Sequence, residues 1–302
     1  MVILMSLNEA YRIFIEDRKS YCEAKTISYY KENVTKFINY MEDECDVSEL
    51  QELTKEHYVD YLTYLRGSDI KNTTIHTYLR AVRAFVNFCL DNEYMSVNIT
   101  YRVKLPKPDA ALKIPLSTAE VDKIDAVFDL DEKGMRNYLI VHCMLDMGMR
   151  RQEVINLKKD DINYQDKFLI INKSKNNKSR VVPVPAMLLE YIRTYISKYN
   201  RFSDYVFVKL IKFNEQLSDE TIKQLFQDLK KESGVDRLHP HLLRHTFASS
   251  YMLYVGDIYM LKVLLGHSKI TTTEGYVHVA NQMKLIHYDL YKIDDVFLKK
   301  SY

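Results

Sequence analysis

The chain has 302 residues, 47% apolar and 28% charged, which is long enough for two domains with separate cores and excludes a disordered chain or a disulfide-rich miniprotein. Its 43 basic and 41 acidic residues give a formal charge of +2, with 14 basic and 16 acidic residues in the stretch 1–107, so neither half is a basic tail. Because no run of about 18 apolar residues is present, we expect no membrane span and no membrane partner.

Helices dominate the expected fold, since only 7 Gly and 6 Pro are available to interrupt them. Thr26 is expected to cap one N-terminal helix, and Asn72 or Thr73 to cap another. Two weaker helical patterns lie near residues 8–21 and 54–66, which completes a four-helix bundle. The two clear apolar stripes are Ile27, Tyr30, Val34, Phe37, Ile38 and Met41 in the first helix, and Ile75, Leu79, Val82, Phe85, Val86 and Cys89 in the second.

A basic, proline-containing linker is expected at residues 105–116, between an N-terminal helical domain (1–104) and a second domain (117–302). Ser117 followed by Glu120 has the pattern of a capping box and predicts the helix that opens the second domain. The prolines that interrupt the helical pattern are Pro106, Pro108 and Pro115.

The second domain is expected to be mostly helical with a small β-sheet. Residues 167–172 and 180–185 are β-branched runs joined by the polar loop KSKNNKS, which predicts a hairpin with a basic tip. A third short strand is expected at 206–208. After residue 217 the chain is expected to be helical again, with breaks at residues 234–240, at Gly256 and at Gly266. The predicted fold class is therefore mainly α with a small sheet.

Two motifs place arginines at fixed spacing. In MGMRRQEVINL (147–157), Gly148 ends one predicted helix and Arg150 stands at the start of the next. In HPHLLRHTFASS (239–250), His241 and Arg244 lie one turn apart on one helical face.

Two further segments supply a phenol, an imidazole and mobile cations. In LLGHSKITTTEGYVHV (264–279), His267 follows a glycine turn and Tyr276 follows nine residues later. The tip and end of the hairpin carry Lys173, Lys175, Lys178 and Arg180.

Two arginines, a lysine and two imidazoles around one phenol form a set suited to an anionic phosphorus centre. Arginine donates parallel hydrogen bonds to phosphate oxygens, and two arginines offset the charge that grows in the transition state without a metal. A phenol with a pKa near 10 becomes a nucleophile when cations and a histidine stabilise its oxyanion. The sequence therefore predicts phosphoryl chemistry in which the arginines take the place of a metal.

These motifs resemble those of the tyrosine site-specific recombinases, the phage integrase family, and the resemblance covers the whole chain. It departs at Met147, where the family often has Thr, at Gln152, where it often has Ser, and in the hairpin sequence SKNNKSR. Lys175 is the best positional match in that hairpin, with Lys173 and Lys178 as competitors. The matching residues are Gly148, Met149 and Arg150 with Glu153, then Lys175, His241 with Arg244, Leu265, Gly266 and His267, and Tyr276.

The resemblance implies a SAM-like core-binding domain followed by a catalytic domain. It implies that Tyr276 attacks a DNA phosphodiester to give a 3′-phosphotyrosine without any cofactor, and that strands are exchanged between two duplexes through a Holliday junction without ATP. Arg150 and Arg244 would clamp the non-bridging oxygens, and Lys175 would protonate the leaving 5′-oxygen. The two remaining candidates, His241 and His267, would handle the phenol proton and hold the phosphate.

The expected partner is double-stranded DNA with paired inverted half-sites, enclosed by the two domains. We expect a tetramer on two DNA sites, with a directionality factor as a possible accessory protein, in the bacterial cytoplasm and at the nucleoid when bound. A C-terminal helix at about 282–298 would pack on its own domain or, as the resemblance implies, dock into a neighbouring subunit. Expected DNA contacts are Arg80, Arg83, Arg102, Lys104, Lys107, Lys173, Lys178 and Arg180.

Other functions fit parts of the pattern. A DNA-binding accessory protein could keep the fold without the chemistry, and a type IB topoisomerase or telomere resolvase would use similar chemistry with a different outcome. His239, His241 and His245 could instead bind a metal, but no acidic partner of the H-E-x-x-H type accompanies them. Each residue alone also fits a solvated surface or a core position, and the joint order and spacing favour the recombinase.

Overall fold

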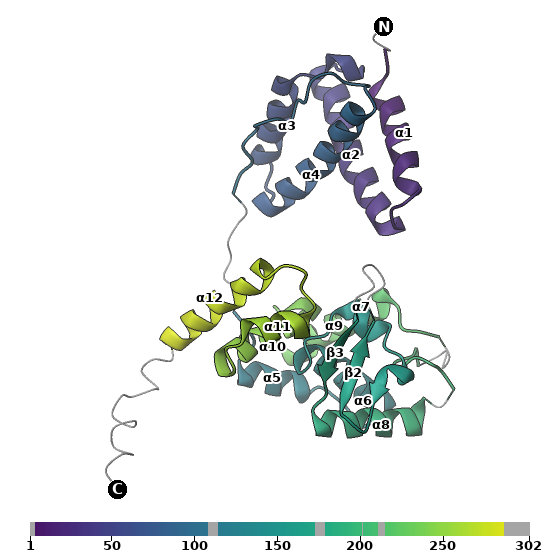
Figure 1. Cartoon of the computed structure of the whole chain (residues 1–302), viewed down its shortest axis with the longest axis vertical. Coiled ribbons are helices and arrows are strands. Elements are labelled where there is room, and N and C mark those ends of the chain that lie inside the picture. The colour runs from purple at the N-terminus through teal and green to yellow at the C-terminus, as the bar shows by residue number, and fades with distance from the viewer. Residues whose placement is uncertain (1–3, 108–113, 173–178, 201, 211–214, 287–302) are drawn as a thin grey trace. The chain divides into compact units, whose positions relative to one another are not determined.

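The computed structural model describes residues 4–107, 114–172, 179–200, 202–210 and 215–286, with side chains described to residue 283. The chain divides into two compact units, Met1–Ala111 and Leu112–Tyr302 (Figure 1). Within the described residues, none of the helices combines the length and apolar character that crossing a bilayer requires.

The N-terminal unit is a helical bundle, as predicted. Its helices are α1 (Leu7–Lys19), α2 (Ala24–Cys45), α3 (Lys55–Gly67) and α4 (Asn72–Asp91), with a 3₁₀ turn at Leu50–Glu52. The apolar stripe of α4 and most of that of α2 are buried in one core that also contains Phe14, whose ring centroid lies 5.6 Å from that of Phe85.

Two helices begin earlier than their predicted caps. The N–H groups of Thr26 and Ile27 both donate to the carbonyl of Glu23, so Thr26 already lies in the first turn of α2. Likewise, Lys71 precedes α4 and accepts from Thr74 N–H, which places Asn72 inside the helix. Neither N-cap residue makes a side-chain cap, so the start of each helix carried no capping signal in the sequence.

The C-terminal unit packs helices around a small sheet. Its first helix is opened by the predicted capping box, in which Ser117 Oγ accepts from Glu120 N–H and the Glu120 carboxylate accepts from Ser117 N–H. The helices are α5 (Thr118–Asp125), α6 (Glu132–Leu145), α7 (Arg151–Ile155), α8 (Ala186–Tyr199), α9 (Asp219–Ser233), α10 (Pro240–Tyr254), α11 (Ile258–Leu265) and α12 (Thr271–Ile286). A 3₁₀ turn at Lys159–Asp161 precedes the sheet.

The sheet is antiparallel, in the order β1 (Ile162–Asn163), β2 (Phe168–Ile171) and β3 (Arg180–Pro183). The predicted hairpin is confirmed as β2 and β3. The predicted third strand at 206–208 is wrong, because that segment makes only isolated bridges and the third strand is β1. The apolar side chains of residues 206–208 are nevertheless buried, so this segment belongs to the core although its backbone is irregular.

Helices α6 and α10 form the centre of the C-terminal unit. Residues 139–144 of α6 are buried on every side, which is typical of a helix enclosed by others. Helices α6, α11 and α12 pack around α10. This arrangement allows hydrogen bonds between residues that are separated by 96 positions in one case and by 116 positions in another. The candidate site is built at this junction.

Candidate active site

Arg150 is presented by the short connection between α6 and α7. Gly148 has a φ of +63°, and a Cβ at this position would collide with the ring of Phe247, so both the backbone angle and the packing require glycine. Arg150 follows in extended conformation as the N-cap of α7, with its side chain 33% exposed. The predicted position of Arg150 at the start of a helix is confirmed.

Glu153 ties the backbone and the side chain of Arg150 together. Its Oε2 accepts from Arg150 N–H over 2.7 Å and its Oε1 accepts from Arg150 Nη1 over 2.9 Å. Burial alone would raise the pKa of Glu153, but hydrogen bonds from Arg180 and the charges of Arg180 and Arg150 outweigh it and lower the pKa to about 2. The carboxylate is therefore ionised and holds the Arg150 guanidinium in place.

Arg244 lies one turn beyond His241 on α10 and is 3% exposed. Its Nη1 donates to the carbonyl of Gly148, and its Nη2 donates to Leu265 O over 2.6 Å. Burial, with the positive charge of Arg150, lowers the pKa of Arg244 to about 9, so the guanidinium is still charged at neutral pH. The backbone on both sides of the site thus fixes the Arg244 side chain.

His267 is held in one tautomer by its two neighbours. Arg244 Nη2 lies 3.2 Å from His267 Nε2, and because arginine can only donate, Nε2 accepts. His267 Nδ1 then carries the proton and donates to Thr273 Oγ1 over 2.9 Å. Gly266, with a φ of +62°, ends α11 and turns the chain toward this histidine.

Tyr276 lies within α12, between two histidines. Its ring is nearly parallel to that of His267, with centroids 6.3 Å apart, and its centroid is 5.3 Å from that of His245. Burial raises the pKa of Tyr276, and the charges of Arg244 and Arg150 only partly offset it, so the expected net stabilisation of the phenolate by cations is not seen.

The expected helix at 282–298 needs correction at its start. Helix α12 already begins at Thr271, so Tyr276 lies in the same helix as residues 282–286. Residues 287–298 lie outside the described residues.

One cavity of about 400 Å³ is lined by Arg150, His241, Arg244, His267 and Tyr276. These are the predicted catalytic residues that fall within the described chain, and the structure brings all of them together. Lys173, Lys175 and Lys178 lie outside the described residues. The other lining residues are Ile114, Arg237, His239, Leu242 and His245.

The prediction that Arg180 contacts DNA is wrong. Arg180 is 7% exposed, and each of its guanidinium nitrogens donates within the protein, two of them to Glu153 and Nε to Leu264 O. A guanidinium this deeply buried, with all three nitrogens bonded inside the protein, is not presented to a phosphate on the DNA surface.

The other predicted DNA contacts in the N-terminal unit differ in exposure. Arg80, Lys104 and Lys107 are exposed, and so is Arg102, whose guanidinium lies over the Tyr101 ring. Arg83 is half-buried and donates to the carbonyl of Val103, which fixes the segment that follows α4.

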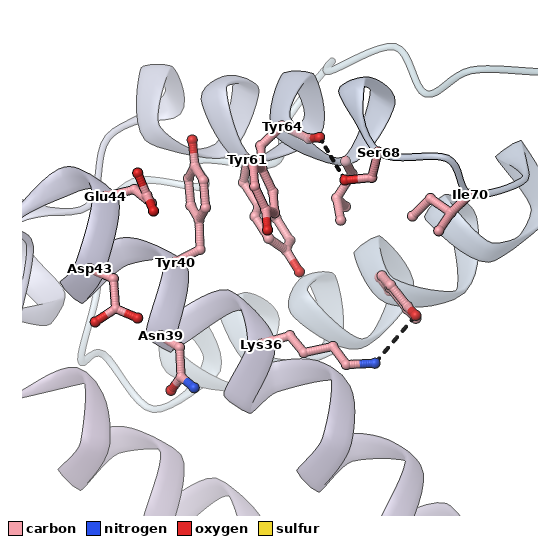
Figure 2. A pocket seen from close by; sticks show the side chains of 11 residues that line it. Lys36, Asn39, Tyr40, Asp43, Glu44, Tyr61, Tyr64, Ser68 and Ile70 are labelled. Carbon is pink, nitrogen blue, oxygen red and sulfur yellow. Dashed lines mark hydrogen bonds between the residues drawn. The ribbon is translucent and has the colours of Figure 1, made fainter.

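A second cavity, of about 380 Å³, lies in the N-terminal unit and is lined by tyrosines of α2, α3 and α4 (Figure 2). Lys36 Nζ lies 3.3 Å from the Tyr78 hydroxyl on one side of it. Asp43 and Glu44 lie on another side, and their carboxylates disfavour a phosphate there. The cavity is therefore not a candidate for the DNA backbone.

Sequence reasoning missed three supporting residues. Thr273 is fully buried and orients His267; His239 caps α10 by accepting Leu242 N–H; and Glu153, although part of the matched motif, had no assigned role. The pattern H-P at the start of a helical segment is a capping signal that could have identified His239. Among the described residues, no cluster of three or more His, Cys, Asp or Glu side chains is arranged to hold a metal.

Comparison with known proteins identifies the family. The profile described as "Phage integrase family" matches residues 116–283, and that described as "Phage integrase SAM-like domain" matches residues 6–104. The chain belongs to the phage integrase family. Its relatives include tyrosine recombinase XerC of Bacillus pumilus (strain SAFR-032), 29% identical over 278 residues, which span 88% of this chain and 90% of the relative. Tyrosine recombinase XerA of Pyrococcus furiosus is 33% identical over 221 residues, 72% of this chain and 74% of the relative.

Solved structures of recombinases share the fold of this phage integrase family member. The Tn1549 transposon integrase in complex with a circular intermediate DNA has a TM-score of 0.74 at 17% identity, covering 90% of this chain and 95% of that one. XerH bound to a palindromic difH substrate has a TM-score of 0.74 at 19% identity, covering 96% and 85%. The chain is thus a tyrosine recombinase, an enzyme of DNA strand transfer.

In this recombinase, His142 of α6 joins α5 to the connection that carries Arg150. Its Nε2 lies 3.0 Å from Asp125 and its Nδ1 lies 2.7 Å from Asp146. Burial opposes the charged imidazolium, but hydrogen bonds to Asp125 and Asp146 outweigh it and raise the pKa to about 9. The imidazolium therefore stabilises the fold fully below pH 6.5, and this contribution is lost as the pH rises through about 9.

We expect His142→Gln to lower the unfolding free energy at pH 6 by about 3 kcal/mol, and the difference from the parent to shrink at pH 9.5. Urea unfolding at both pH values measures this. The exposed His278→Gln serves as the control and should differ little from the parent at either pH. A deficit of His142→Gln that stays constant between the two pH values would contradict the assignment.

Proposed function

We propose that Tyr276 is the nucleophile with which this recombinase cleaves and rejoins DNA at a specific site. The observation that carries the proposal is that the phenol of Tyr276 lines one cavity together with Arg150, Arg244, His241 and His267. The Tyr276 Oη–phosphorus bond forms while the bond from phosphorus to the 5′-oxygen breaks, which leaves a 3′-phosphotyrosine and a free 5′-hydroxyl.

Each neighbouring side chain has a proposed role. The one-third-exposed Arg150 and the buried Arg244 donate to the non-bridging oxygens and offset the charge of the pentacoordinate transition state. His241 and His267 take up the phenol proton and hydrogen-bond the phosphate. Lys175, proposed from the sequence motif alone, protonates the leaving 5′-oxygen. Because the ester is conserved in the phosphotyrosine, a 5′-hydroxyl from a second duplex can attack it without ATP.

A nicked suicide substrate tests this function. A preferred site is first selected from random duplexes, and a nick near the scissile phosphate then lets the free strand diffuse away after cleavage. We expect a covalent complex whose phosphotyrosine maps by mass spectrometry to the peptide containing Tyr276, and strand exchange when a second duplex is supplied. A protein that binds its site but forms no adduct would be an accessory protein, and relaxation of supercoils without strand exchange would indicate a topoisomerase.

The proposed DNA contacts of the N-terminal unit are its exposed cations. These exposed side chains are Arg80, Arg102, Lys104 and Lys107. They differ from Arg180, whose guanidinium is buried and hydrogen-bonded within the protein. We expect Lys104→Gln with Lys107→Gln to lessen the slope of log K against log salt by about 0.9 for each phosphate that the variant no longer neutralises. The change Lys19→Gln, at an exposed lysine paired with Glu16, should leave the slope unaltered. An unchanged slope in the double variant would remove these lysines from the interface.

Assembly is the last part of the proposal. Four subunits on two DNA sites with inverted half-sites would exchange strands, in a bacterial cell at the chromosome, with a directionality factor as an optional partner. Removal of residues after 286, beyond the described helix α12, should leave single-site binding intact and abolish synapsis in sedimentation experiments. Normal four-subunit synapses in the truncated protein would refute a role for that segment.

A further inference from the structure

The carboxyl end of α11 is the point at which the arginines of the site converge. The last carbonyls of a helix lack intrahelical donors and carry the negative end of the helix dipole, so they attract cations. Here three successive carbonyls, those of residues 264–266, each accept from a different arginine. Arg180 Nε donates to Leu264 O over 2.7 Å, Arg244 Nη2 to Leu265 O over 2.6 Å, and Arg150 Nη2 to Gly266 O over 3.4 Å.

Of these three arginines, Arg180 does not line the cavity. Its Nη1 and Nη2 donate to the two oxygens of Glu153, both over 2.7 Å, in a bidentate pair that leaves its side chain 6% exposed. The same carboxylate accepts from Arg150, so Glu153 bridges an enclosed arginine and one that faces the cavity.

The backbone at Gly266 also packs closely against Arg180. A Cβ at Gly266 would lie 3.1 Å from Arg180 Cδ and 3.1 Å from its Nη1, tighter than ordinary packing. The positive φ of Gly266 favours glycine, and the absence of a side chain there leaves room for the arginine. One side chain thus fixes the Glu153 carboxylate and the turn that precedes His267.

We infer that Arg180 is a positioning residue for strand cleavage, which acts by holding Glu153 so that Glu153 holds Arg150. This inference rests on the proposed function. Without Arg180, the buried carboxylate has Arg150 as its remaining charged partner, and the guanidinium is drawn from the phosphate position toward Glu153. The effect falls on the transition state, because Arg180 itself is too enclosed to touch DNA.

The test compares single-turnover cleavage of the suicide substrate by the full-length protein and its variants. We expect Arg180→Met to cleave about 100-fold more slowly, as is typical when a reacting group is misplaced by about 1 Å, with site binding unchanged. Arg180→Lys, which keeps the charge but not the bidentate geometry, should recover part of the rate. Arg151→Met is the matched control, because Arg151 pairs with Asp219 over 3.1 Å outside the cavity and should cleave normally.

Two readouts separate positioning from general destabilisation. Since Arg180 keeps the pKa of Glu153 low, the acid limb of the pH–rate profile should move to higher pH in Arg180→Met and, to a smaller extent, in Arg180→Lys. In a Glu153→Gln background, Arg180→Met should add no further loss, because the two residues act in series. If Arg180→Met does not fold, the inference is tested by whether the acid limb of the pH–rate profile moves to higher pH in Arg180→Lys.

Parental rates and an unshifted profile in both Arg180 variants would overturn the inference, as would rate losses that multiply in the double variant. If the parent protein itself forms no phosphotyrosine, the proposed function fails. If the parent forms the adduct and Arg180→Met cleaves at the parental rate, only the role of Arg180 is refuted.

Discussion

Replacement of Tyr276 by Phe should abolish the covalent DNA adduct and all strand exchange while leaving site binding intact. The change removes only the phenolic oxygen, and the ring that packs between His267 and His245 remains. Because the phenol pKa is raised by burial, the folded protein gains no stability from an ionised hydroxyl, and we expect a thermal unfolding midpoint close to that of the parent. A suicide-substrate assay resolved by denaturing electrophoresis, with a mobility-shift assay in parallel, measures both properties.

The control for this prediction is Tyr251→Phe. Tyr251 lies on the same helix as Arg244, does not line the cavity, and should form the adduct at the parental rate after removal of its hydroxyl. Residual adduct in Tyr276→Phe would transfer the nucleophile to another tyrosine, which peptide mapping would identify.

The second large effect concerns Arg150 and Arg244, two of the arginines that line the cavity, whose removal should affect the stability of the fold differently. Arg150→Ala and Arg244→Ala should each cleave roughly 100- to 1000-fold more slowly, as for the removal of one donor to a transition-state oxyanion. Arg150 is one-third exposed, so its replacement should have little effect on stability. Arg244→Ala leaves the carbonyls of Gly148 and Leu265 without their donor, at a cost of about 1–3 kcal/mol for each.

Single-turnover rates and urea unfolding of the two variants provide the comparison. Arg237→Ala is a useful third variant, because Arg237 lines the same cavity but its guanidinium is engaged by Glu120 and by the backbone carbonyls of residues 114 and 115. We expect Arg237→Ala to lower the free energy of unfolding, but to lower the cleavage rate much less than Arg150→Ala or Arg244→Ala does. Cleavage by Arg150→Ala at the parental rate would remove Arg150 from the phosphate site.

The sequence by itself determined the elements and the family. The stripes of α2 and α4, the Ser117 capping box and the hairpin are set by residues within a few positions of one another, so local periodicity and capping chemistry predicted them. The order and spacing of the arginine, histidine and tyrosine motifs identified the recombinase for the same reason, since each motif occupies a single helix, turn or helix end.

Only the tertiary structure decided what surrounds each side chain. Arg180 reads as an exposed cation at the end of a polar loop, but Leu264, 84 positions away, and Glu153, 27 positions away, enclose it. Val206 reads as a strand residue, yet its burial comes from packing in the core and not from a ladder. Exposure, charge pairing and pKa depend on groups that the fold brings together from distant positions, and a local pattern contains no information about them.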